Sequence, residues 1–136
     1  MSQENDQPPG DRRHRLRVRY CETDRMGVTH HGSYVDWFEE ARTEWLRNRG
    51  QSYRAWEAQG VFLQVVGVAI QYLHPTTFDD EVSIGVRVTE RRHASFTLSY
   101  DVVLEPGGAL AATGTTKLAC VDADGRLRRL PAWLGD

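Results

Sequence analysis

Most of the chain beyond residue 60 alternates between hydrophobic and polar positions, which is the pattern of half-buried β-strands. In the N-terminal part, Leu16, Val18 and Tyr20 alternate with arginines and would face inward from a further strand. Turns rich in glycine, proline and aspartate separate the later segments. These criteria predict strands at residues 15–22, 81–90, 95–104, 109–121 and 126–130, and the long apolar run at residues 61–73, ended by His74-Pro75, predicts a further strand.

One segment has the period of a helix instead. Its hydrophobic residues recur three or four positions apart and form one continuous face: Tyr34, Trp37, Phe38, Ala41, Trp45 and Leu46. The pattern predicts a helix that begins near Ser33, with Asp36 completing an imperfect capping box, and ends near Gly50. Residues 51–59 form a short second helix in this interpretation, stopped by Gly60.

The order of these elements predicts an α+β domain, because consecutive strands joined by short turns make an antiparallel meander with the helices on one face. A single helix across a curved sheet is the simplest way to bury the aromatic face. The apolar run at residues 61–66 would be hazardous as an open sheet edge, so we expect a second subunit to cover it.

Length and composition limit the organisation further. The 136 residues fit one domain, which we assign to residues 14–136, and the polar, proline-containing residues 1–13 are expected to be a disordered tail. The net charge of -2 gives no positive electrostatic field that would attract nucleic acid. No apolar run reaches the roughly 18 residues of a membrane span, and the start lacks a secretory signal. We therefore expect a cytoplasmic protein.

The densest candidate chemistry lies between the first strand and the long helix. Asp24 follows the strand in a glycine-containing loop, shortly before a helix start whose free N–H groups could hold a developing oxyanion. This arrangement suits acyl transfer or hydrolysis. From spacing alone, Asp24 could also be a turn or cap residue, and His30 and His31 could be solvated. The sequence has no zinc-ligand spacing, and Cys21 remains a weaker candidate nucleophile.

The same segment resembles the signature of 4-hydroxybenzoyl-CoA thioesterase-like hotdog proteins, particularly the branch of Tol–Pal-associated acyl-CoA thioesterases. The signature has an aromatic residue, a D-x-D pair, a glycine-containing turn, a histidine pair, a tyrosine and F-x-E-x-A-R. It stands here as Tyr20, Glu22-Thr23-Asp24, Gly27-Val28-Thr29, His30-His31, Tyr34 and Phe38 to Arg42. Further matches are Tyr72 to Pro75, Phe78 to Asp80, Arg91 to Phe96 and Pro131.

The resemblance implies a hotdog fold, in which a curved antiparallel sheet of five or six strands wraps around one long central helix. It also implies acyl-CoA thioesterase activity without a metal or redox cofactor, in a homodimer or homotetramer whose sites are built from both chains. Asp24 would be the catalytic nucleophile or general base, and the His31 amide would polarise the thioester carbonyl. The substrate would contact Tyr20, Gly27, Val28, His30 and Tyr34. Coenzyme A phosphates would face Arg91, Arg92 and His93, unless that cluster is a solvated hairpin tip.

Three departures from the signature affect the expected substrate more than the reaction. Glu22 replaces the first aspartate, Thr29 replaces an apolar residue, and His30 replaces an aromatic residue. Two other functions remain open. One is a hotdog hydratase or dehydratase that would use His31 with Glu39, and the other is a non-catalytic protein that binds acyl-CoA or an acyl carrier.

Overall fold

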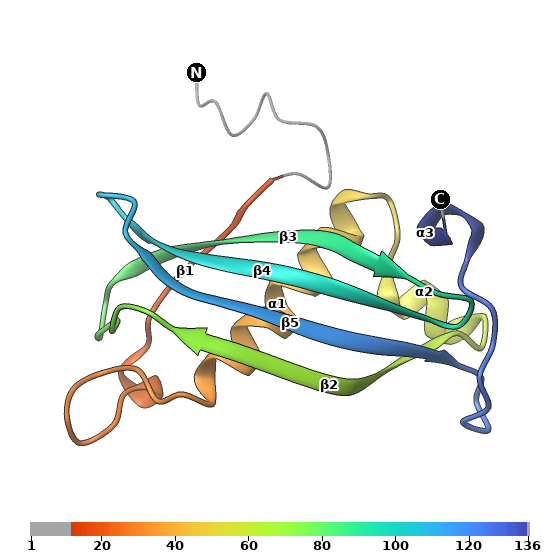
Figure 1. Cartoon of the computed structure of the whole chain (residues 1–136), viewed down its shortest axis with the longest axis horizontal. Helices are drawn as coiled ribbons and strands as arrows, with labels where there is room; N and C mark the ends of the chain where they lie inside the picture. Colours follow the sequence, from red (N-terminus) through yellow and green to blue (C-terminus); the bar gives the residue numbers. More distant parts are fainter. Residues whose placement is uncertain (1–11, 136) are drawn as a thin grey trace.

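Five of the predicted strands form one antiparallel sheet in a computed structural model that describes residues 12–135 (Figure 1). The spatial order is β1-β3-β4-β5-β2, so the first two strands of the chain form the two edges. In a simple meander β2 would pair with its sequence neighbour β3. It pairs with β5 instead. The strands are β1 (His14–Arg17), β2 (Phe62–Tyr72), β3 (Glu81–Arg91), β4 (Ser95–Glu105) and β5 (Leu110–Val121).

The predicted long helix is α1 (Ser33–Asn48), which lies across one face of the sheet (Figure 1). All six residues of its predicted hydrophobic face are buried. The short second helix is α2 (Tyr53–Ala58), and its N-cap Ser52 accepts a hydrogen bond from the Ala55 amide. A C-terminal helix, α3 (Ala132–Gly135), is an element that the sequence analysis did not predict.

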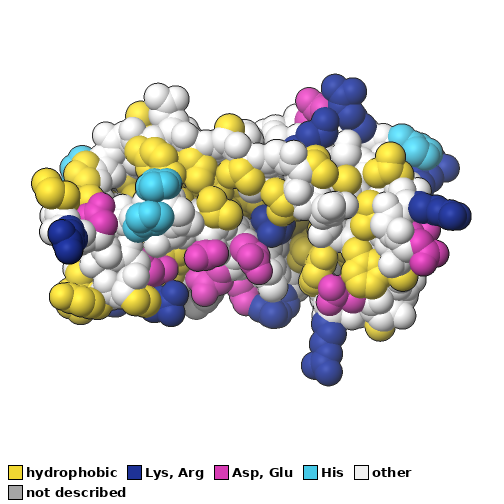
Figure 2. All heavy atoms as spheres, turned by 90° about the horizontal axis from the view of Figure 1, so that it is seen from below, with side chains coloured by type: hydrophobic (Ala, Val, Ile, Leu, Met, Phe, Trp, Pro, Cys, Tyr) yellow, Lys and Arg dark blue, Asp and Glu magenta, His cyan; other side chains and the backbone are white. Residues whose placement is uncertain are grey.

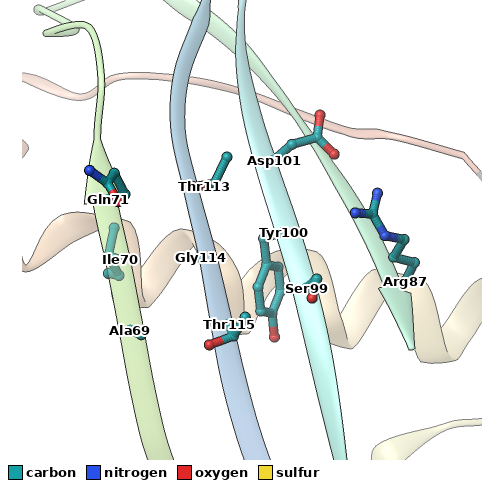
Figure 3. A pocket seen from close by; sticks show the side chains of 10 residues that line it. All are labelled: Ala69, Ile70, Gln71, Arg87, Ser99, Tyr100, Asp101, Thr113, Gly114 and Thr115. Atoms are coloured by element: carbon teal, nitrogen blue, oxygen red, sulfur yellow. The ribbon is translucent and has the colours of Figure 1, made fainter. Parts of the chain in front are cut away.

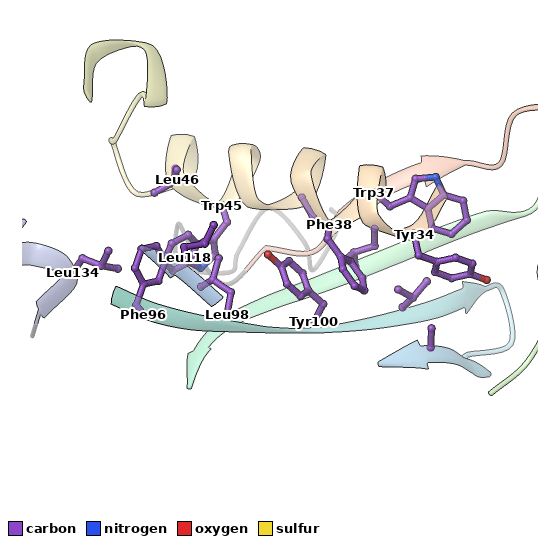
Figure 4. Packing of buried hydrophobic residues seen from close by; sticks show 14 of the residues in the cluster. Tyr34, Trp37, Phe38, Trp45, Leu46, Phe96, Leu98, Tyr100, Leu118 and Leu134 are labelled. Carbon is purple, nitrogen blue, oxygen red and sulfur yellow. The ribbon is translucent and has the colours of Figure 1, made fainter. Parts of the chain in front are cut away.

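The core is the contact between α1 and the inner face of the sheet (Figure 4). At its centre the ring of Phe38 stacks on Tyr100, with centroids 4.2 Å apart and planes inclined by 10°. Gly114 on β5 lies beneath Phe38, and a Cβ atom there would be 2.5 Å from its Cε2 atom. The helix can approach the sheet this closely because β5 carries no side chain at this point.

The first predicted strand is too long. It ends at Arg17, and Tyr20–Glu22 form a 3-10 turn, η2, in which the carbonyl of Tyr20 accepts hydrogen bonds from the amide and hydroxyl of Thr23. These local bonds replace a strand ladder. Tyr20 is therefore not directed inward, as predicted, but is 77% exposed, with its ring edge-on to Phe78.

Three further expectations differ from the structure. Gly32, not Ser33, is the N-cap of α1, so the capping box is absent. Residues 126–130 form one isolated bridge, Val121 to Leu127, in place of a strand. The predicted tail falls mostly on residues 1–11, outside the described part of the chain, but Arg13 belongs to the folded domain because it pairs with Asp101 at 2.7 Å.

The β2 edge is as apolar as the sequence indicates. Val65, Val66 and Val68 are 44%, 55% and 44% exposed, and a bulge leaves Val66 outside the pairing with β5. Seen from the β2 side, the molecule shows hydrophobic side chains next to a group of acidic ones (Figure 2). An exposed edge of this kind is a ready template for pairing with another strand.

Replacing Gly114 by alanine should lower the free energy of unfolding by about 1–3 kcal/mol, because the new methyl group overlaps the Phe38 ring and forces the helix away from the sheet. Urea denaturation followed by circular dichroism would measure the change. Gly67→Ala is the matched control, since a Cβ there makes only an ordinary contact of 3.6 Å with Lys117. Equal stability of both variants would contradict the packing described for Phe38.

Candidate active site

The loop that carries Asp24 is a short antiparallel ladder closed by a tight turn. Thr23 and Thr29 form a bridge, and the Asp24 amide donates to the carbonyl of Val28 at 2.8 Å. The Gly27 amide returns to the carbonyl of Asp24 at 3.0 Å, with Gly27 at a φ of 83° that favours glycine. Asp24 is thereby held at the start of a turn with a defined backbone.

The returning arm of this ladder is fixed to the segment before β3. The Thr29 amide donates to the Thr76 carbonyl at 2.8 Å, and the Thr77 hydroxyl donates to the Gly27 carbonyl at 2.7 Å. Val28 and Thr77 form a bridge. The loop is therefore anchored to the sheet, although it is largely exposed itself.

The Asp24 carboxylate is exposed, and only one of its two oxygens has a hydrogen-bond partner in the described part of the chain. Its Oδ1 atom accepts a hydrogen bond from the Met26 amide at 2.8 Å. No residue between 12 and 135 donates to its Oδ2 atom or forms a salt bridge with it. One carboxylate oxygen is fixed while the other can reach a ligand.

The chain enters α1 through His30, His31 and Gly32. The His30 ring accepts the Gly32 amide at Nδ1, and the two imidazole rings lie with centroids 4.2 Å apart. Within the described part of the chain, the His31 amide has no acceptor, whereas its carbonyl accepts the Tyr72 hydroxyl at 2.9 Å. The start of the helix thus presents a free backbone donor next to a carbonyl anchored to β2.

Asp24 and His31 line the same crevice, which has a volume of about 330 Å³. The crevice also holds Val28 and Tyr34, so it brings together four of the predicted site residues. Its remaining wall is formed by Thr29, Tyr72, Leu73, His74 and Pro75, which the sequence analysis did not select. A signal for the last four was present, because the family resemblance includes them as a matched segment.

Behind the crevice three buried hydroxyl groups form a chain. The Thr29 hydroxyl donates to the Thr76 carbonyl at 3.1 Å and lies 2.6 Å from the Thr76 hydroxyl, which is 3.0 Å from the phenol of Tyr34. Because Thr29 has a single proton, Thr76 donates to Thr29, and Tyr34 donates to Thr76. Burial raises the pKa of Tyr34 above its usual value, opposed by its hydrogen bond to Thr76. The phenol therefore stays protonated and keeps donating.

The other predicted site residues lie outside this crevice. Tyr20 packs against Phe78, and Gly27 forms the turn of the loop. The His30 ring lies next to the ring of His31, which lines the crevice, but His30 does not line it. The predicted phosphate contacts, Arg91 to His93, are at the opposite end of the sheet, beyond the Ser95–Ala119 pair (Figure 1). A single chain does not bring this hairpin to Asp24.

The two arginines of that hairpin also have contacts within the chain. Arg91 donates through Nε to the Leu134 carbonyl at 2.7 Å and so holds α3. Arg92 pairs with Glu90 at 2.6 Å and remains largely exposed. Because an exposed ion pair contributes little stability, Arg92 could exchange Glu90 for a phosphate at small cost.

A second hollow, of about 370 Å³, lies against the middle of β2, β3, β4 and β5 (Figure 3). Its carboxylate, Asp101, is neutralised by Arg13, and the remaining lining side chains include Ser99, Thr113 and Thr115. It contains no histidine or cysteine. The hollow offers no nucleophile or base comparable to Asp24.

The crevice places a carboxylate next to a helix start. The fold that holds it is that of a hotdog protein, and comparisons with known proteins agree on the fold. The model of the thioesterase-like superfamily matches residues 18–136, and the chain belongs to this family. The acyl-CoA thioester hydrolase YbgC of Escherichia coli O157:H7 is 34% identical over 79% of this chain and 79% of its own length. The predicted hotdog architecture is confirmed by two solved structures.

The first is a DHNA-CoA thioesterase from Staphylococcus aureus, which is 33% identical, superposes with a TM-score of 0.83 and covers 87% of this chain and 79% of its own. The second is a hypothetical protein from Aquifex aeolicus, which is 31% identical with a TM-score of 0.84 over 90% of this chain and 94% of its own. None of the described helices is long and apolar enough to cross a membrane.

Replacing Thr76 by valine should destabilise the domain by about 1–3 kcal/mol, because the buried hydroxyls of Thr29 and Tyr34 both lose a partner. Thermal unfolding monitored by circular dichroism would measure it. Thr113→Val is the control, a substitution of the same shape on the polar side of β5, where it lines the second hollow. A similar effect of the two substitutions would show that the hydroxyl chain contributes nothing particular.

Proposed function

We propose that the protein is an acyl-CoA thioesterase that hydrolyses a thioester to the free acid and coenzyme A, with Asp24 as its catalytic carboxylate. The observation that carries this proposal is the position of Asp24, whose Oδ2 atom shares a crevice with the His31 amide, both without a hydrogen-bond partner among residues 12–135. The chemistry needs no metal or redox cofactor, because the thioester carbonyl is already an electrophile. Since coenzyme A thioesters are intracellular metabolites, we place the activity in the cytoplasm.

Two routes use the same groups. In the first, Asp24 attacks the carbonyl carbon and the C–S bond breaks, which releases the coenzyme A thiolate. One water then hydrolyses the acyl–Asp24 anhydride to the free acid and the Asp24 carboxylate, and the proton that this water releases passes to the thiolate. In the second, Asp24 takes a proton from an attacking water and returns it to the leaving thiolate. In both, the His31 amide donates to the oxyanion that forms on the carbonyl oxygen. Both the open carboxylate oxygen and the exposed helix start support this assignment.

The exposed β2 edge supports a dimer in which two β2 strands pair antiparallel about a two-fold axis. Such pairing places the Phe62 end of one β2 against the Tyr72 end of the other. The Arg91–His93 hairpin lies at the Phe62 end of each sheet, and the crevice lies at the Tyr72 end. The same hairpin of the partner subunit would therefore approach this crevice and could hold the coenzyme A phosphates. Two such dimers could associate as a tetramer.

The rival hydratase or dehydratase function receives less support from the geometry. It requires a carboxylate of α1 near His31, but Glu39 is exposed and lines a different hollow with Asp36 and Glu40. A purely binding function does not account for the open Asp24 oxygen. Hydration of crotonyl-CoA and release of free thiol from a panel of acyl-CoAs would separate the three activities.

Asp24→Asn should reduce kcat at least about a hundredfold, because the amide is neither a nucleophile nor a base of comparable strength. Thiol release from acyl-CoA substrates of different length and aromaticity measures the effect. The fold should be unaffected, because the amide oxygen can still accept the Met26 amide. Asp36→Asn, an exposed carboxylate of α1 outside the crevice, is the control. Near-normal turnover by Asp24→Asn would refute the assignment.

Val66→Glu should convert the dimer to a monomer, because pairing of the two β2 edges would bury one unpaired carboxylate from each subunit. Light scattering after gel filtration gives the mass. The KM for an acyl-CoA should rise at least about tenfold, whereas the matching N-acetylcysteamine thioester, which lacks the nucleotide, should change far less if the partner holds the phosphates. Leu127→Glu, at another exposed apolar position, is the control. An active Val66→Glu monomer with unchanged KM would exclude this dimer.

A further inference from the structure

Glu22 is a buried carboxylate for which the proposed reaction has no direct use. Only 6% of the residue is exposed, in a loop whose neighbours are mostly accessible. Its nearest cation, Arg19, is largely exposed and lies 3.5 Å away. A carboxylate held this far from water needs other donors.

Those donors come from the two chain segments that flank the Asp24 loop. Glu22 Oε1 accepts the Arg19 amide at 2.8 Å, on the entering segment. Glu22 Oε2 accepts the indole N–H of Trp37 at 2.9 Å, one turn into α1. Each oxygen of the carboxylate is thus used, one by the chain before the loop and one by the helix after it.

The backbone of Glu22 continues the same connection. Its carbonyl accepts the His30 amide at 2.7 Å and the Ser33 hydroxyl at 3.4 Å. The next contacts along the chain are the Thr23–Thr29 bridge and the Asp24 amide bond to Val28. Glu22 is therefore the base of the ladder that ends in Asp24, and its side chain attaches this base to the helix whose start carries the His31 amide.

We propose that Glu22 is a positioning residue, which through Trp37 fixes the distance and orientation between the Asp24 carboxylate and the His31 amide. The proposal rests on the function proposed above and explains why the crevice keeps its shape on an exposed loop. A displacement of about 1 Å between reacting groups can cost on the order of a hundredfold in rate. The sheet side of the loop is held separately, by Thr76 and Thr77.

The position requires a carboxylate in particular, because both oxygens accept N–H groups. A glutamine of the same shape has one oxygen and one NH2 group. Its NH2 would face either the Arg19 amide or the Trp37 indole, so that two donors oppose each other. Glu22→Gln therefore loses one of the two attachments without changing the volume of the side chain.

The test compares Glu22→Gln and Trp37→Phe with Trp56→Phe in the intact chain. Trp56 is the matched control, because it is also a buried tryptophan whose indole donates to a side chain, Gln51 at 3.1 Å, but on α2. We expect kcat to fall about 10- to 100-fold in Glu22→Gln and about 3- to 10-fold in Trp37→Phe, with KM changed by less than about threefold. Trp56→Phe should stay within about twofold of the parent.

Adding Glu22→Gln to Asp24→Asn should produce no further loss, since Glu22 acts through Asp24. Amide hydrogen exchange of residues 22–31 provides a readout independent of activity, and we expect faster exchange at Asp24 and His30 in both Glu22→Gln and Trp37→Phe. If Glu22→Gln does not fold, Trp37→Phe carries the test alone.

The proposal is overturned if the folded variants keep the kcat of the parent, or if exchange in the loop is unchanged. It is also overturned if Glu22→Gln lowers activity independently of Asp24→Asn. If Asp24→Asn itself retains activity, the proposed function fails, and exchange at Asp24 and His30 still decides whether Glu22 holds the loop.

Discussion

The close contact between the aromatic face of α1 and the sheet is the constraint on which the rest of the structure depends. Phe38 can stack on Tyr100 only because Gly114 leaves room beneath its ring. Packing at this density leaves little freedom for the helix to slide. The position of its first residues, and with them the His31 amide, therefore follows from the core several residues away. The crevice shared by Asp24 and His31 therefore depends on how the helix packs on the sheet.

The Asp24 loop must be held relative to that helix by polar contacts, because few of its side chains are buried. On one side, Thr76 and Thr77 tie it to the segment leading into β3. On the other, Glu22 joins it to Trp37. A loop supported in this way can remain accessible to solvent and still hold Asp24 at a fixed position relative to His31, which hydrophobic packing alone would not allow.

Most elements of the fold could be predicted from periodicity, since α1 follows the helical period and β4 alternates closely between buried and half-buried positions. Strand β2 was predicted from its apolar run instead, and its burial does not alternate. Periodicity failed where local hydrogen bonds decide the backbone, as at Tyr20, whose carbonyl is taken by Thr23 and whose side chain points outward. The Asp24–His31 pair could be predicted from motif and helix start together. The residues Tyr72–Pro75 were matched by the family resemblance, but their place in the crevice wall was not predicted. The contact of Glu22 with Trp37 had no signal in the sequence. Both depend on contacts between distant segments. The distance of Arg92 from Asp24 within one chain follows from topology, which no local pattern encodes.

The strand order also affects how the domain can assemble. Strand β2 is the second strand in the sequence, yet its only partner in the described sheet is β5, the last strand. The two pair through residues such as Phe62 with Val121 and Tyr72 with Ala112. Pairing β2 with β5 closes a loop that contains β3 and β4, and this closure costs conformational entropy. The β3–β4 and β4–β5 hairpins should therefore form before β2 pairs with β5. During synthesis on a ribosome, the apolar β2 segment therefore remains unpaired until β5 has emerged. The strand proposed to join two subunits is therefore also among the last to find its place within one.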